Sequence, residues 1–256
     1  PELDQVNHKV AFTFMVDPGM RAYIRRIDIT GNTKTRDEVI RREFRQMEGA
    51  WFDTSKIKKS KQKVDRLDFF SEVNIETPQV AGTNDQLDIS LSVKEKLTGD
   101  FSLGAGLSSG VGLIFTGSVT ERNLFGTGNH LTTQINTSKI NQVYSMSYTN
   151  PYYTDEGVSR SFDLYKRDVN SARTGVISPY RTQTLGTGVR FGVPIGDDES
   201  IFYGLSVEQA ALSITTASPA RVIQYVDLFG SSTTNLTGTI GWGYDNRDSA
   251  IYTTEG

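Results

Sequence analysis

The stretch GLSSG, at residues 106–110, is the segment of this chain that most resembles a catalytic motif. It has the Gly-x-Ser-x-Gly form in which serine hydrolases present a nucleophilic hydroxyl, here that of Ser108. This chemistry needs a base, and the chain contains only His8 and His130 as histidine candidates. It also needs a sharp turn between a strand and a helix, whereas residues 111–120 alternate as a strand does. We therefore expect Ser108 to lie beside a hairpin turn and not to act as a nucleophile.

Other candidates for ligand chemistry are weak for physical reasons. LGAG and LFGTG are rich in glycine, but no helix is expected after either, so a bound phosphate would lack a helix N-terminus. GDDES is a short acidic turn, and we expect it to be no more than a turn. The chain has no cysteine, which excludes disulfides, thiolate nucleophiles and cysteine-based metal sites. The sequence therefore predicts no enzyme, no metal and no cofactor.

The composition of the chain changes near residues 97–100, which predicts a domain boundary there. Residues 1–98 contain more than half of the charged residues but only 4 of the 24 glycines. A formal net charge of -3 gives no electrostatic reason to expect a nucleic-acid partner. No apolar run is long enough for a transmembrane helix. The mean hydropathy of -0.38 suits a transmembrane β-barrel as well as a water-soluble protein, because only alternate strand residues of a barrel face lipid.

The charged half predicts a mixed α/β domain. Residues 23–30 alternate as a strand and end at a Gly-Asn turn. TRDE, from Thr35, has the form of a capping box that would begin a helix extending to Gly49, and a second helix is expected from about Asp53. Two further alternating segments, EVNIET and LDISLSVKEK, complete the order β-α-α-β-β. KVAFTFMVD resembles the last segment, so residues 1–19 are predicted to end a preceding copy of this unit.

The glycine-rich half predicts eight successive strands, which lie between Phe101 and Tyr244. Short connections (NLFGTGN, NPYYTDEG and GDDES) alternate with long ones at residues 168–183 and 213–235. This arrangement is expected of a bacterial outer-membrane barrel with its short turns on the periplasmic side. From the pattern alone, a soluble barrel or sandwich is the alternative. We expect these aromatics to form girdles at the membrane interfaces: Phe125, Tyr152, Tyr153, Phe229, Trp242 and Tyr244.

Several motifs of the first half together resemble a POTRA (polypeptide-transport-associated) domain: RRIDITGN, MEGAWFD, DFFSEV and VKEK. The glycine-rich strand that follows, with NLFGTGN and TNPYYTDEGVS, extends the resemblance to the BamA family, the central barrel subunits of the bacterial β-barrel assembly machinery. The resemblance implies an α+β POTRA domain (β-α-α-β-β) followed by antiparallel transmembrane β-barrel strands, about eight of an expected sixteen. The expected domains are the tail of a preceding POTRA domain (1–19), a POTRA domain (20–97) and the N-terminal half of the barrel (98–256).

The resemblance also implies a function, which is assembly and insertion of β-barrel proteins into the bacterial outer membrane. The POTRA domain would lie in the periplasm, nascent outer-membrane proteins would be the clients, and the strands would contact outer-membrane lipid. The nearest alternative is a POTRA-containing transporter of the two-partner secretion or translocation-assembly type. A passive porin would need no POTRA domain.

The first barrel strand is predicted to be a weakly paired lateral gate that pairs with client strands. Four glycines between residues 104 and 112 forgo side-chain contacts, which corresponds to a weakening of about 2–4 kcal/mol. A freed strand edge could then pair with an incoming strand by β-augmentation. Ordinary hairpin geometry is the alternative explanation of these glycines. The predicted client-pairing edge consists of Phe101, Ser102, Leu103, Gly104, Ala105, Gly106, Leu107 and Ser108.

The helix end in RREFRQMEG is predicted to be a docking site for a partner. By the same resemblance, the Glu of this MEG turn lies where a helical lipoprotein of the BamD type docks. The predicted docking residues are Arg41, Arg42, Arg45 and Glu48. Ordinary solvated charges at a helix end are the alternative.

Overall fold

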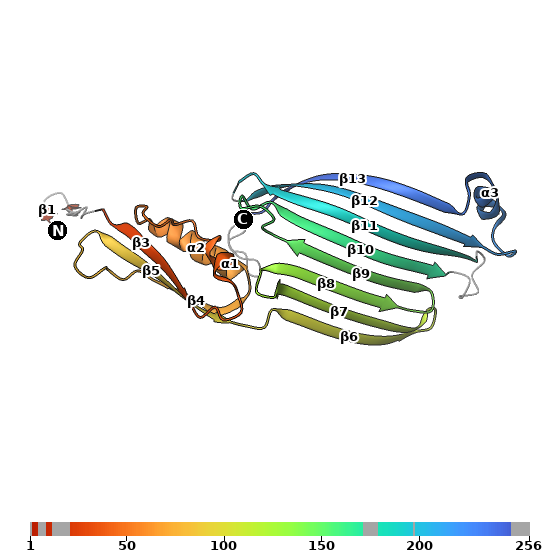
Figure 1. Cartoon of the computed structure of the whole chain (residues 1–256), viewed down its shortest axis with the longest axis horizontal. Coiled ribbons are helices and arrows are strands. Elements are labelled where there is room, and N and C mark those ends of the chain that lie inside the picture. Colours follow the sequence, from red (N-terminus) through yellow and green to blue (C-terminus); the bar gives the residue numbers. More distant parts are fainter. Residues whose placement is uncertain (1, 5–8, 12–20, 171–178, 197, 247–256) are drawn as a thin grey trace.

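The computed structural model describes residues 2–4, 9–11, 21–170, 179–196 and 198–246 (Figure 1). Near the N-terminus, β1 (Glu2–Asp4) and β2 (Lys9–Ala11) form a two-stranded antiparallel pair. The rest of the predicted domain tail at residues 1–19, together with His8 and the final YTTEG, lies outside the described residues.

The charged half folds into the predicted β-α-α-β-β order. Its three strands form one sheet in the order β3-β5-β4, in which β3 is parallel and β4 antiparallel to the central β5. Asp53 begins the longer helix as predicted, because its carboxylate accepts hydrogen bonds from the Ser55 and Lys56 amides at 2.8 and 3.3 Å. The elements are β3 (Tyr23–Thr30), α1 (Asp37–Arg41), α2 (Thr54–Arg66), β4 (Phe70–Glu76) and β5 (Gln86–Glu95).

The core of this domain draws apolar side chains from its strands and both helices. Ile24 of β3, Ile40 of α1, Val64 of α2 and Leu91 of β5 are all fully buried. In β5, Ile89, Leu91 and Val93 alternate with more exposed residues, as expected for a strand with one covered face.

The prediction of a capping box at Thr35 is wrong. The N-cap residue is Arg36, and no side chain caps α1, which ends at Arg41 instead of continuing to Gly49. The Thr35 hydroxyl instead accepts a hydrogen bond of 2.8 Å from the Asn123 side chain, and the Thr35 amide donates to the Glu95 carboxylate at 2.7 Å. The Thr35 hydroxyl and amide, which a capping box would use locally, therefore form hydrogen bonds with residues distant in sequence.

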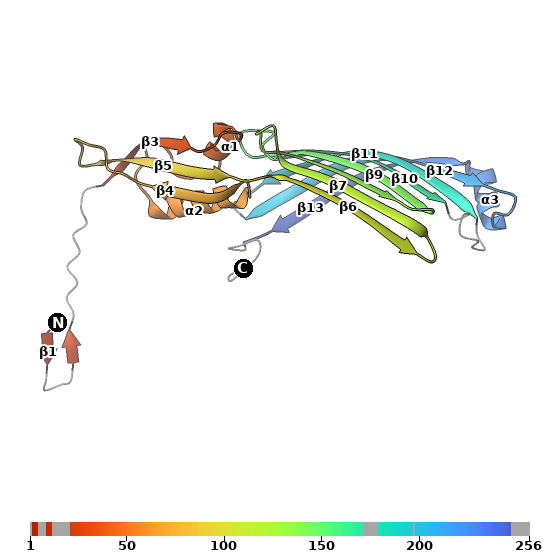
Figure 2. The ribbon, with the colours of Figure 1, turned by 90° about the horizontal axis from the view of Figure 1, so that it is seen from below.

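The glycine-rich half forms one eight-stranded antiparallel sheet in which each strand pairs with its neighbours in sequence (Figures 1 and 2). Figure 2 shows that the sheet is arched, with β6 and β13 at its two edges. The strands are β6 (Gly99–Ser108), β7 (Gly112–Leu124), β8 (Asn129–Thr137), β9 (Asn141–Asn150), β10 (Ser159–Asn170), β11 (Tyr180–Pro194), β12 (Glu199–Ile214) and β13 (Ser232–Tyr244).

The two faces of this sheet differ in chemistry. Residues directly opposite in the ladders share a face, so Leu164 lies beside Met146 and Thr187. We call the side that carries Leu103, Phe115 and Leu164 the apolar face, since all three side chains are exposed there. On the opposite, polar face, Asp163 accepts hydrogen bonds from Ser147 at 2.7 Å and Arg190 at 2.9 Å.

The connections lie at two rims, a proximal rim beside the α/β domain and a distal rim at the far end (Figure 1). The proximal connections are short, as predicted. At the distal rim only the last two are long, since residues 109–111 and 138–140 form short turns. The last contains a helix that the sequence analysis missed, α3 (Ala220–Phe229), and Phe229 therefore lies in a helix and not at a strand end. No helix in the described part of the chain has the length and apolar character needed to cross a bilayer.

Candidate functional site

The predicted client-pairing edge coincides with β6, the first strand of the sheet. Strand β6 pairs with β7 from Gly99↔Glu121 to Ser108↔Gly112, and within the described residues no strand pairs with its other side. Its apolar face is strongly exposed, with Phe101 at 70%, Leu103 at 76% and Leu107 at 86%. The eight predicted edge residues thus lie together on β6, which pairs with β7.

Two of the four glycines between residues 104 and 112 lie within β6, and the other two lie beyond its end. This division lowers the estimated weakening of the first strand. Gly110 lies in the turn after β6, and Gly112 is the first residue of β7, where its φ of +77° favours glycine. Only Gly104 and Gly106 lie within the weakened part of the strand, so two glycines remain and the expected effect falls to about 1–2 kcal/mol. A Cβ at Gly104 would lie 2.6 Å from the Thr116 hydroxyl oxygen, whereas a Cβ at Gly106 would meet no atom within 4 Å.

Ser108 lies where the sequence analysis expected. It is the last residue of β6 and is followed by a hairpin turn into β7, with no helix. His130 lies near the start of β8, and its ring contacts that of Phe69 with centroids 6.5 Å apart. Within the residues that the structure describes, no group of three or more His, Asp or Glu could hold a metal ion.

Two of the predicted docking residues, Arg41 and Glu48, secure an irregularity in β3. The β3–β5 register shifts between Ile24 and Ile27, and the Ile27 amide donates to a Glu48 carboxylate oxygen at 2.8 Å. The Arg41 guanidinium donates to the Ile27 carbonyl at 3.2 Å and to Glu48 at 3.4 Å. A hydrogen bond to Asp37 and the nearby carboxylates raise the pKa of Arg41, so it stays charged. Both side chains remain about half exposed, which leaves them accessible to a partner.

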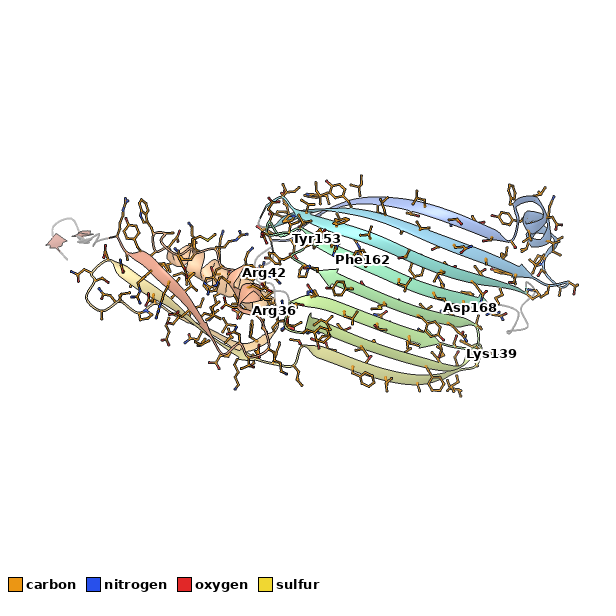
Figure 3. The ribbon with its side chains drawn as sticks, in the orientation of Figure 1. Arg36, Arg42, Lys139, Tyr153, Phe162 and Asp168 are labelled. Atoms are coloured by element: carbon orange, nitrogen blue, oxygen red, sulfur yellow. The ribbon has the colours of Figure 1, made fainter. Side chains whose placement is uncertain are left out.

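The other two predicted docking residues lie elsewhere, so the four do not form one cluster. The Arg45 amide donates to the Ser60 hydroxyl of α2 at 2.8 Å. The Arg42 guanidinium lies 4.1 Å from the centre of the Tyr152 ring, which belongs to the proximal turn between β9 and β10. Figure 3 shows Arg42 where the α/β domain meets the sheet. Tyr152 therefore packs against the α/β domain, which corrects its expected place in an aromatic girdle.

Around Arg42 the structure contains a buried polar contact between the two domains. Glu43 is 7% exposed and accepts a hydrogen bond from the Tyr152 hydroxyl. Burial raises the pKa of Glu43, and burial together with the neighbouring Glu43 carboxylate raises the pKa of Tyr152 to about 12. Burial also lowers the pKa of Arg42, whose Nε and Nη2 have no hydrogen-bond partner in the described structure.

The first proximal turn, NLFGTGN, makes a second contact between the domains. The Asn123 side chain donates to Thr35 at 2.8 Å and accepts from the Gly128 amide at 2.8 Å, and the Arg36 amide donates to the Gly126 carbonyl at 2.9 Å. Gly126 and Gly128 have φ angles of +74° and +72°. A Cβ on Gly126 would clash with the Lys34 carbonyl oxygen. We call this contact and the Arg42–Glu43–Tyr152 contact the junction.

The sequence analysis used both junction turns as motifs of the resemblance and placed Phe125 and Tyr152 in aromatic girdles, but it predicted no contact between the two domains. Residues of these turns interact with partners about 90 to 110 positions away, and no local pattern reveals such pairs. The composition of the first turn could have indicated this contact, because closely spaced glycines and an asparagine in a short turn allow two backbones to approach closely.

Two family models match this chain. Residues 123–256, just over half of the chain, match the model described as the Omp85 superfamily domain. Residues 22–96 match the POTRA model, described as a surface antigen variable number repeat.

Similar proteins include several curated relatives with one name. Outer membrane protein assembly factor BamA of Neisseria meningitidis serogroup B is 37% identical over 257 residues, covering 96% of this chain and 32% of the relative. The protein of the same name from Nitratidesulfovibrio vulgaris is 29% identical and covers 85% of this chain and 26% of the relative. This chain thus spans about a third or less of these relatives' length.

Solved structures agree with this similarity. The crystal structure of BamA from Haemophilus ducreyi lacking POTRA domains 1–3 matches with a TM-score of 0.75 and 31% identity, covering 100% of this chain and 50% of that one. CdiB from Acinetobacter baumannii matches with a TM-score of 0.56, covering 87% of this chain and 41% of that one. At 14% identity, the latter shows the fold alone.

Proposed function

Because this chain belongs to the Omp85 superfamily and joins a POTRA domain to half of a barrel sheet, we propose that it takes part in assembling and inserting β-barrel proteins. The sheet lies in the bacterial outer membrane and the POTRA domain in the periplasm. In this proposal the chain provides a strand edge for client proteins and carries out no covalent chemistry.

The weak strand preference of β6, the first strand of the sheet, is the observation that supports the proposal most strongly. A strand edge in lipid leaves backbone N–H and C=O groups without partners, which is costly because hydrocarbon offers no hydrogen bonds. A client strand that pairs with residues 101–108 would satisfy those groups by β-augmentation. The client would thereby leave water for a membrane position without exposing its own backbone to lipid.

Weak strand preference in β6 supports a gate that opens. Gly104 and Gly106 offer no side chain to pack across the ladder to β7, and each lowers strand stability by about 0.5–1 kcal/mol. On the polar face, β6 contacts β7 through a hydrogen bond of 2.8 Å between the Ser102 and Ser118 hydroxyls and, nearer the start of the strand, through an ion pair between Asp100 and Arg122. Replacement of one strand partner by another therefore needs little free energy at this edge.

Site-specific photo-crosslinking in the full-length protein would test the client-pairing edge. A benzophenone side chain at Leu103 or Leu107 of β6 should give adducts with nascent barrel proteins. Leu164 of β10 is the matched control, since it lies on the same apolar face with 52% exposure but in a strand that is paired on both sides. Equal client adducts at Leu164, or adducts there alone, would disprove the gate.

We also propose that Arg41, Arg45 and Glu48 contribute to docking of a helical lipoprotein of the BamD type. Arg41 and Glu48 present opposite charges on the same exposed part of the POTRA domain, and such pairs favour an oriented polar partner. Arg42 is not included, because its guanidinium packs on Tyr152 in the junction.

The test of docking must separate charge from structure, since Glu48 also accepts the Ile27 amide. Glu48→Gln keeps an acceptor for that amide while removing the charge, and we expect it to reduce co-purification of the lipoprotein with the full-length protein. Glu38, which is 69% exposed and lies in α1, provides the control substitution Glu38→Gln. Unchanged co-purification with Glu48→Gln would remove Glu48 from the docking site.

A further inference from the structure

A polar cluster interrupts the apolar face near the distal rim. It consists of Lys139, Lys166, Asp168, Asn170 and Arg181. Apart from Lys166, these residues line a hollow of about 100 Å³ together with Ile140 and Gln142. Figure 3 shows Lys139 and Asp168 near each other at the end of the sheet away from the POTRA domain.

Strand register places Lys166, Asp168, Asn170 and Arg181 on the apolar face, and Lys139 lies in the adjoining turn between β8 and β9. Asp168 lies opposite Gln142 on β9 and Gln183 on β11, and Asn170 lies opposite Arg181. Along β10, residues 162, 164, 166, 168 and 170 share one face, and the first two are the exposed Phe162 and Leu164. Asp168 is four residues beyond Leu164, which places it about 13 Å farther toward the distal rim.

The cluster carries a surplus of positive charge. Asp168, which is 9% exposed, is paired with Arg181, whose Nε donates to it at 2.9 Å, and Gln183 also donates to it at 3.1 Å. Within the described residues, Lys139 and Lys166 form no direct ion pair or hydrogen bond, although Lys166 is close enough to Asp168 to interact with it electrostatically. One carboxylate thus orients one guanidinium, and two ammonium groups remain for an external anion.

The cluster also contains an acceptor that lacks a donor. The Asn170 side-chain oxygen is buried and has no hydrogen-bond partner in the described part of the chain. A buried acceptor without a donor is costly, and a hydroxyl or amide N–H from a ligand would satisfy it. A ligand complementary to this site would therefore have both anionic oxygens and hydrogen-bond donors.

We propose that this cluster binds the headgroup of a phosphorylated glycolipid in the outer leaflet. Lys139 and Lys166 contact a phosphate group, Arg181 adds a further cation held by Asp168, and Asn170 accepts a hydrogen bond from a sugar hydroxyl or amide. The distal rim lies on the side of the membrane opposite the periplasmic POTRA domain, so the outer leaflet supplies the ligand. An acyl chain of the same lipid would lie along the apolar face beneath, over Leu164 and Phe162.

Native mass spectrometry of the full-length protein in lipid nanodiscs would test this proposal. The probes are bisphosphorylated lipid A, its dephosphorylated form and phosphatidylglycerol. The variant Lys139→Gln/Lys166→Gln leaves the Asp168–Arg181 pair intact. The matched control, Lys58→Gln/Lys61→Gln, removes two exposed lysines from α2 of the POTRA domain. Faster migration of the unheated protein on a gel confirms that each variant still forms a barrel.

We expect the double variant to retain about tenfold less bisphosphorylated lipid A than the wild type, since two charge-assisted contacts are lost. The α2 control should change retention by less than about twofold. Retention that is unchanged in the folded double variant would overturn the proposal. Equal wild-type retention of dephosphorylated lipid A or of phosphatidylglycerol would also overturn it, because the phosphate or the sugar would then not be recognised.

Discussion

The strands of the POTRA domain and those of the eight-stranded sheet both alternate apolar and polar residues. The two regions differ in what covers the apolar face that results. Every buried hydrophobic side chain of the described residues lies between Ile24 and Val93, in the POTRA domain. In the sheet, the large apolar side chains of one face are exposed, for example Leu113, Phe115, Leu164 and Leu185. The POTRA strands pack against helices, whereas the sheet needs a covering that the described protein does not supply. Lipid provides that covering.

This difference shows that a strand pattern specifies which face is apolar but not which solvent or layer covers it. The surrounding segments carry that information. Helical periodicity flanks the POTRA strands, whereas turns alone separate most barrel strands, so the described connections between the barrel strands form no layer over the apolar face.

Truncation of a large apolar side chain should cause the largest difference in stability loss between the POTRA domain and the sheet. Leu91→Ala removes a side chain that is 0% exposed, so the free energy of unfolding of the POTRA domain should fall by about 2–5 kcal/mol. Leu164→Ala, on the apolar face of the sheet, should lower barrel stability far less, because lipid fills the space. Hydrogen exchange of peptides within residues 86–95 and 159–170, in the full-length protein in liposomes, measures both. Equal losses of stability in the two variants would contradict the proposed difference between a protein core and a lipid-covered face.

A charge placed on the apolar face should test the lipid covering directly. Leu164→Arg near the middle of β10 should destabilise the barrel by about 2–4 kcal/mol, since a charge at that depth faces hydrocarbon. Met47→Arg, at a POTRA position that is 66% exposed, should change stability by less than about 0.5 kcal/mol. Denaturant titration of the protein in liposomes measures the first effect. A Leu164→Arg variant as stable as the wild type would mean that water covers this face.

The stability of the junction between the POTRA domain and the sheet should depend on pH. Burial raises the pKa of Glu43 above its ordinary value of 4.5. The folded state therefore holds the proton more tightly than the unfolded state. The resulting stabilisation is complete below about pH 4.5, the ordinary pKa of a glutamate, and is lost as the pH rises through the raised pKa of Glu43. Glu43→Gln, which cannot ionise, should abolish this dependence.

Hydrogen exchange of the Arg36 and Gly128 amides would measure the junction, because both donate across or within it. After correction for intrinsic exchange rates, their protection should be greater near about pH 5 than near about pH 7.5 in the wild type. Asp65→Asn provides a control, since burial also raises the pKa of Asp65, which lies in α2 away from the sheet. A Glu43→Gln protein that keeps the pH dependence would show that another group is responsible.

The smallest expected effect concerns the first strand itself. Gly106→Val adds a side chain where no atom lies within 4 Å of the new Cβ, so it should strengthen β6 by about 0.5–1 kcal/mol. If β6 is the gate, client folding in proteoliposomes should slow. Gly104→Val should instead destabilise the strand, because its Cβ would lie 2.6 Å from the Thr116 hydroxyl. Unchanged client folding rates with Gly106→Val would argue that β6 does not open.

The sequence predicted most of the fold because the relevant signals are local. Alternation identified all eight barrel strands, and Asp53 marked the start of α2 through contacts within three residues. α1 was predicted to be too long, since the Thr35 motif was read without knowledge of Asn123. α3 was missed because it lies within a long connection that was treated as a loop.

The candidate site was only partly predictable, for the same reason. The position of β6 as the first strand of the sheet followed from chain order, but the division of the nearby glycines between β6, the turn and β7 required the pairing register. Arg42 and Glu48 were placed together from their closeness in sequence. Tertiary contacts separate them, since Arg42 packs on Tyr152 and Glu48 accepts the Ile27 amide.

Gly126 fits closely against the POTRA backbone and Gly128 against the Val39 and Arg42 side chains, so this turn limits which POTRA domains can be exchanged between relatives. Lys34, Thr35 and Arg36 meet this turn through main-chain atoms and one hydroxyl, so the orientation of the POTRA domain is inherited from the shape of a loop that belongs to the barrel. A chimera that grafts a foreign POTRA domain onto this barrel must import the matching loop with it. The natural module for recombination therefore extends past the domain boundary, through residue 128.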